Sequence, residues 1–130
     1  MKFSAHKAAV AQTPAERLRR GRAAALAVRA AFPRVQQLRI DFRFEETSSY
    51  ALAPQSHLLY PPARAFFVFP CPHANCDGQF DLTTIVRSTV ADDTLASRGT
   101  VVCSGSRALD HGGSKQPCGL NLIYSVTALL

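Results

Sequence analysis

The side chains best suited to chemistry in this sequence are four cysteines, Cys71, Cys76, Cys103 and Cys118. Four residues separate the first two, and a proline directly follows the first, which lies within the spacing range of structural zinc sites. The second two are separated by fourteen residues. One of them closes a predicted strand and the other opens the next, so an antiparallel hairpin would bring them together. Because four thiolates complete the tetrahedral coordination of zinc, the sequence predicts one structural Zn²⁺ ion bound by these residues.

Glycines support this interpretation. Three of the cysteines have a glycine one or two positions later, namely Gly78, Gly105 and Gly119. Glycine allows a positive φ, and we expect this to aim backbone N–H groups back at the thiolates. Zinc bound by four thiolates keeps a net negative charge, so such donors would stabilise the site. A disulfide has no such requirement.

In these features, residues 66 to 124 resemble the broad zinc-ribbon and treble-clef group of zinc-binding domains. The resemblance is carried by Cys71-Pro72, Cys76-Asp77-Gly78, Cys103-Ser104-Gly105 and Cys118-Gly119. It implies two short cysteine turns around one zinc ion in a domain that binds nucleic acid or protein. The sequence departs from the group in its longer first spacing, in the distance between the second two cysteines, and in a predicted helix between the two pairs.

The sequence leaves other uses of the cysteines open. They could be buried unpaired thiols, disulfides or a redox pair, or ligands of an iron–sulfur cluster. Three thiolates and a water would instead form an open, catalytic zinc site, which would make the protein an enzyme. His73 or His111 could replace one cysteine ligand. Asp110 and His111 could form a catalytic pair, although adjacent residues on a glycine-rich loop rarely hold acid–base geometry.

The N-terminal third of the chain is strongly basic. Residues 1–43 carry a net charge of +8 and the remainder −2, which gives the total of +6. Such asymmetry is typical of proteins that bind RNA or DNA, or an acidic protein surface, and a solvated helix face is the alternative. The arginines that we expect to contact phosphates are Arg17, Arg19, Arg20, Arg22 and Arg29.

Aromatic residues give a weaker signal for nucleic-acid binding. We expect Phe66, Phe67 and Phe69 to lie in the core, because they belong to an apolar run. Tyr50, Tyr60 and His57 lie on a predicted loop and are the candidates for exposed, base-stacking rings.

The predicted elements form an α+β fold, with an N-terminal helix, a small antiparallel sheet of about four strands and one further helix. We expect the zinc ion to hold these elements together. The first helix begins with a capping box of Thr13 and Glu16 around Pro14 and is expected to reach about Ala31. Its predicted core stripe is Leu18, Ala25, Val28 and Phe32. The other predicted elements are a one-sided strand over 37–45, a loop over 47–62, a central strand over 63–69, a helix from Asp81 to about Ser97 ended by Gly99, and strands over 100–103 and 119–130.

At 130 residues, the chain has the length of one domain. We expect residues 1–12 to form a flexible tail and residues 13–130 a single α+β zinc-binding domain. No export signal is visible, and no stretch approaches the roughly 20 apolar residues that a membrane-spanning helix needs. We therefore expect a cytoplasmic protein, with no membrane partner and no evident small-molecule substrate. The function prediction is a non-catalytic zinc-binding protein that binds nucleic acid or a ribonucleoprotein. The alternative is a zinc-stabilised adaptor between proteins.

Overall fold

The computed structural model describes residues 13–45, 53–92, 94–108 and 115–130, and the predicted tail over 1–12 lies outside this part of the chain. The fold is α+β, as predicted. Its elements in chain order are α2 (Pro14–Ala24), α3 (Val28–Ala31), β1 (Gln37–Glu45), β2 (Gln55–Leu59), β3 (Val68–Pro70), β4 (Gln79–Asp81), α4 (Thr83–Ala91), β5 (Ala96–Val102), β6 (Ser106–Ala108), β7 (Lys115–Pro117) and β8 (Asn121–Leu129).

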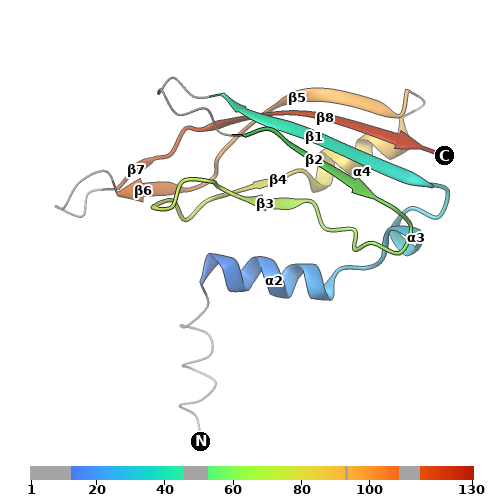
Figure 1. Cartoon of the computed structure of the whole chain (residues 1–130), viewed down its shortest axis with the longest axis horizontal. Helices are drawn as coiled ribbons and strands as arrows, with labels where there is room; N and C mark the ends of the chain where they lie inside the picture. Colours follow the sequence, from blue (N-terminus) through green and yellow to red (C-terminus); the bar gives the residue numbers. More distant parts are fainter. Residues whose placement is uncertain (1–12, 46–52, 93, 109–114) are drawn as a thin grey trace, which may run out of the picture.

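The main sheet has four antiparallel strands in the order β2-β1-β8-β5 (Figure 1). Strand β1 has the bounds that the sequence predicts, and it alternates as expected. Leu38, Ile40 and Phe42 are buried, whereas Arg39 and Arg43 are exposed on the other face. Period-two burial of this kind makes one face of an antiparallel sheet apolar and leaves the other in water.

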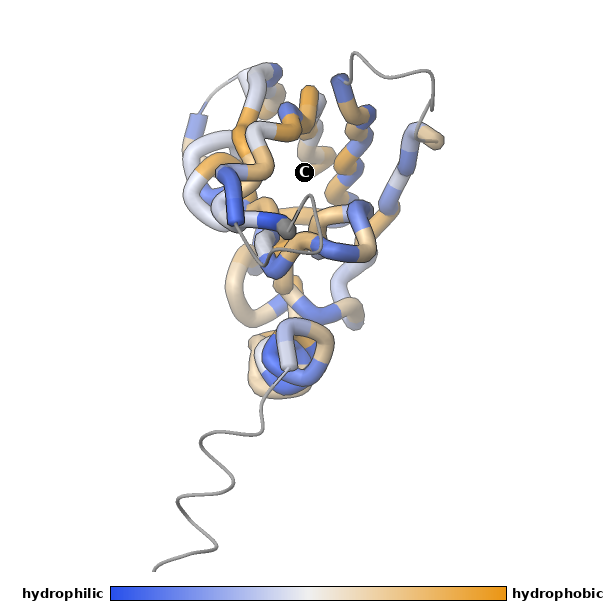
Figure 2. The backbone as a smooth tube through the Cα atoms, turned by 90° about the vertical axis from the view of Figure 1, so that its left-hand side faces the viewer, coloured by the Kyte–Doolittle hydropathy of each residue, from blue (hydrophilic) through white to orange (hydrophobic). Residues whose placement is uncertain are grey.

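The apolar face of the sheet is covered by α4 and by the two-stranded β3–β4 sheet. Phe67, Phe80, Leu82 and Val86 are buried there against the strands. Helix α2 packs on β3, and Figures 1 and 2 show it as an outer layer on the side of β3 that faces away from the main sheet. The order of layers is therefore main sheet, core with α4 and β3–β4, and α2.

The first helix is shorter than predicted. Its capping box is present, with Glu16 N donating to Thr13 Oγ1 and Thr13 N to Glu16 Oε2. The helix ends at Ala24, because the next residues pair with a distant segment: Ala27 forms a β-bridge with Arg64. A second, short helix, α3, follows. This pairing outweighs the local helix propensity. The residues of the predicted core stripe therefore do not lie on one face of a single helix, and α2 itself has no buried residue.

The predicted central strand over 63–69 is also wrong. Only Val68–Pro70 is a strand, and it pairs with β4 in a separate small sheet. The predicted loop over 47–62 contains β2, an edge strand of the main sheet, while residues 46–52 lie outside the described part. Phe67 is buried and Phe69 packs against the core as expected, but Phe66 is only partly buried and does not belong to the core. The apolar run therefore predicts neither sheet membership nor the position of Phe66 correctly.

The second predicted helix and the strand after it have different bounds. Helix α4 ends at Ala91, and Gly99 lies inside β5 instead of ending a helix. The helix begins at Thr83, two residues later than predicted, and its N-cap is Leu82, which makes no side-chain capping bond. Asp81 precedes the cap, and its carboxylate accepts a hydrogen bond from Thr83 N at 2.9 Å. Within the described residues, no helix is both long and apolar enough to cross a membrane.

Candidate metal centre

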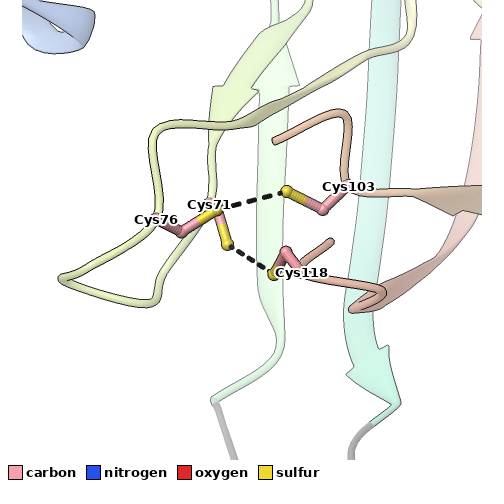
Figure 3. A group of neighbouring side chains, drawn as sticks. All are labelled: Cys71, Cys76, Cys103 and Cys118. Carbon is pink, nitrogen blue, oxygen red and sulfur yellow. Dashed lines mark hydrogen bonds between the residues drawn. The ribbon is translucent and has the colours of Figure 1, made fainter. Parts of the chain in front are cut away.

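The four cysteine side chains point toward one another (Figure 3). All four sulfur atoms lie within 4.8 Å of one another, and the cysteines are free thiols. Sγ of Cys76 is 3.5 Å from Sγ of Cys103, and Sγ of Cys71 is 3.8 Å from Sγ of Cys118. A tetrahedron with Zn–S bonds of about 2.3 Å has sulfur–sulfur edges of about 3.8 Å. The group could therefore hold a metal ion such as zinc.

Two β-hairpin-like connections place the sulfur atoms. Cys71 follows β3 and Cys76 precedes β4, so both belong to the turn that joins this antiparallel pair. Cys103 follows β5 and Cys118 precedes β8, which are antiparallel neighbours in the main sheet. The hydrogen bond from Cys103 N to Leu120 O continues that pairing to the site. The predicted meeting of these two strand ends is confirmed.

Each of the four sulfur atoms accepts a hydrogen bond from the backbone N–H two residues later. Gly78 N donates to Cys76 Sγ at 3.3 Å, and Gly105 N donates to Cys103 Sγ at 3.4 Å. The Leu120 amide donates to Cys118. The expected backbone donors are thus present. Cys71 has one as well, from the His73 amide. No glycine lies one or two positions after Cys71 in the sequence, so the glycine pattern does not indicate this donor.

Gly78 and Gly105 also bring the two cysteine turns into direct contact. A Cβ on Gly78 would lie 2.5 Å from Gly105 N and would overlap Cys103 Sγ, and a Cβ on Gly105 would overlap the Gly78 backbone. Among the glycines in the described residues, only Gly119 has a positive φ, of 69°. The expectation that all three glycines serve a positive φ is therefore wrong. Two of them are needed for the close approach of backbone to backbone.

Polar contacts outside the sulfur atoms join the turns further. Asp77 accepts a hydrogen bond from Ser106 N at 2.9 Å and forms an ion pair with Lys115 at 3.6 Å. The Ser106 amide has the largest effect on the pKa of Asp77 and lowers it; desolvation, the next largest, opposes this, and the Lys115 charge adds to the lowering. Ser104 Oγ donates to Gln79 O at 3.1 Å. These contacts cross from the first turn to the second, so they support the arrangement of the ligands.

The surroundings shift the pKa values of the cysteine thiols in different directions. Burial raises the pKa of Cys71 well above the ordinary range and that of Cys103 to about 11. Burial would also raise the pKa of Cys118, but the Leu120 amide and the neighbouring cysteines lower it overall. Burial therefore favours the protonated form of Cys71 and Cys103. A metal ion would have to displace these protons, because thiolates are the binding form.

The remaining predicted site residues lie elsewhere. His73 is half-buried in the first turn, and the ligand group found among the described residues consists of the cysteines without it. Asp110 and His111 lie outside the described residues. All the predicted phosphate-binding arginines are exposed, with Arg29 separated on α3 and the others on α2.

Comparison with protein families, with curated proteins and with solved structures gave no match. The resemblance to zinc-ribbon and treble-clef domains is therefore not supported by a family match. The chain is an α+β protein with four clustered cysteines that could hold a metal ion.

Proposed function

We propose that this protein is a small, non-catalytic domain held together by one structural zinc ion, which binds nucleic acid or a ribonucleoprotein through α2. The observation that carries the zinc assignment is the set of four sulfur atoms within 4.8 Å of one another, each with a backbone N–H donor. The spacing suits a single ion. A multi-iron cluster distributes four cysteines over two or four irons, so some of their sulfur atoms lie farther apart than those around a single ion.

A structural role for the ion follows from the number of ligands. Four thiolates saturate tetrahedral zinc, whereas a catalytic zinc keeps one position for water or substrate. The ion would connect the β3–β4 turn with the ends of β5 and β8, which are otherwise joined by short contacts between two turns. Its contribution would be to folding, because metal binding and folding are coupled in small domains.

Helix α2 supports the nucleic-acid part of the proposal. Arg17, Arg19, Arg20 and Arg22 are all exposed on it. In the part of the chain that the structure describes, none of them forms an ion pair with a carboxylate, and Glu16, the acidic residue of α2, is engaged in the capping box. Exposed, uncompensated arginines on a docked helix attract a polyanion, and the charge of residues 1–43 adds to this attraction.

Salt dependence tests this part. We expect the zinc-loaded protein to bind oligonucleotides, with an affinity that falls steeply between about 50 and 200 mM salt, because phosphate contacts release counterions. A variant in which the four α2 arginines are replaced by glutamine should lose most of this binding. Binding that is absent in the native protein, or present but insensitive to salt, would reject the nucleic-acid role. A single protein captured stoichiometrically after nuclease treatment would then favour the adaptor alternative.

A further inference from the structure

Two hollows flank the contact between α2 and β3, and they meet at shared residues. One lies between α2 and the first cysteine turn, and the other between Arg22 and strand β2. Each has a volume of about 610 Å³, and both are lined by Arg22 and Pro70. We call these two hollows together the basic groove. The residues on which its chemistry depends are Arg19, Arg22, Arg64, His57, Phe66 and Phe69.

The charge of the groove has one sign. Arg19, Arg22 and Arg64 line it, and among its described lining residues there is no aspartate or glutamate. Arg17 and Arg20 lie on the same helix but do not line either hollow. The helix therefore presents one pair of arginines to the groove and another pair away from it. A concave surface with this charge is complementary to an anionic chain.

The groove also has aromatic rings. Phe66, Phe69 and His57 line its second half, and the Arg22 guanidinium lies over the Phe66 ring, 5.3 Å from its centroid. The rings of His57 and Phe69 are 5.0 Å apart. Burial, and then the charge of Arg22, lower the pKa of His57, which disfavours the charged form of this ring. Proteins bind single-stranded nucleic acid on surfaces that combine aromatic rings with arginines. The bases stack on the rings, and the phosphates contact the cations.

We propose that the basic groove binds a single strand of RNA or DNA, with Arg19, Arg22 and Arg64 on phosphates and with bases against Phe66 and its neighbouring rings. This rests on the proposed function and names the site and the form of the ligand. A duplex keeps its bases stacked inside a wide cylinder, so rings within a hollow cannot reach them. An acidic peptide would satisfy the arginines but would leave the rings without a comparable partner.

Two double substitutions on α2 test the groove. Arg19→Ala with Arg22→Ala removes the groove pair, and Arg17→Ala with Arg20→Ala removes the same charge from the same helix outside the groove. Alanine preserves helix propensity in both variants. The probes are a labelled oligothymidylate, the matching oligouridylate and a duplex of equal length, bound to the full, zinc-loaded chain. Zinc content and far-UV circular dichroism show whether both variants are folded. If the groove variant does not fold, Arg19→Ala against Arg17→Ala repeats the comparison.

We expect the groove variant to bind the single strands about tenfold more weakly or worse, with a salt slope reduced by about 1.4, because two phosphate contacts are lost. Arg17→Ala with Arg20→Ala should weaken binding measurably but less, by about threefold, because these arginines add to the attraction for phosphates without lining the groove. Equal losses in both variants, or duplex binding as tight as single-strand binding, would overturn the groove and leave the proposed function standing. Binding of a glutamate-rich peptide, with no binding of any nucleic acid, would overturn both.

Discussion

Replacing Cys103 by serine is expected to abolish zinc binding and cooperative folding together. Cys103 is the most buried of the four cysteines, and serine there would leave three thiolates and a poor fourth ligand. Structural zinc contributes roughly 10–16 kcal/mol of apparent binding energy in small zinc domains. That is comparable to the whole stability of a typical domain, about 5–15 kcal/mol. Metal content per chain and a thermal melt followed by circular dichroism measure the two effects.

Val102→Ser is the matched control for this substitution. It introduces the same side chain one residue earlier, where the native residue is 56% exposed on β5. We expect it to keep one zinc per chain and to cost less than about 1 kcal/mol, as surface strand substitutions do. Should Cys103→Ser retain both zinc and a cooperative melt, the sulfur of this residue would not be a ligand.

The second large effect is expected at the contact between the two cysteine turns. In both Gly78→Ala and Gly105→Ala, the new Cβ meets backbone atoms of the other turn. Backbone cannot rotate away as a side chain can, so the turns must separate and carry their sulfur atoms apart. We expect each change to cost about 3 kcal/mol, at the upper end of the range for overpacking. Each should also speed the release of zinc to a chelator.

Gly119→Ala separates this steric effect from the loss of a glycine near the site. Gly119 adjoins Cys118, and a Cβ there would meet nothing within 4 Å, although its φ of 69° disfavours other residues. The expected cost is about 1 kcal/mol, from backbone strain alone. Denaturant titration of the zinc-loaded variants gives the comparison. Equal costs at the three positions would show that the close contact of the turns is unimportant.

The features that the sequence predicts well are those set by local chemistry. The Thr13–Glu16 capping box and the one-sided burial of β1 depend on residues a few positions apart, and both are confirmed. The sequence also predicts that the cysteines group together, from the spacing of the first two and the expected meeting of two antiparallel strand ends, and the four sulfur atoms do lie together. The Gly78 and Gly105 amides donate to sulfur as expected, although these glycines are needed for close backbone approach and not for a positive φ.

The features that the sequence does not predict depend on distant partners. Helix α2 ends at Ala24 because Ala27 pairs with Arg64, a residue far along the chain. Strand β3 pairs with β4 alone, and an apolar run cannot indicate which strand lies beside it. The approach of Gly78 to Gly105 joins two turns that are far apart in sequence. The division of the α2 arginines into a groove pair and an outer pair likewise depends on which side of α2 packs against β3.

X-ray absorption at the zinc edge, together with metal analysis of the purified native protein, tests the zinc assignment most directly. We expect one zinc ion per chain, surrounded by four sulfur atoms at about 2.3 Å. This result would also exclude an open site with a water ligand. A folded native protein without metal, or an ion coordinated by nitrogen or oxygen in place of one of the four sulfurs, would contradict it.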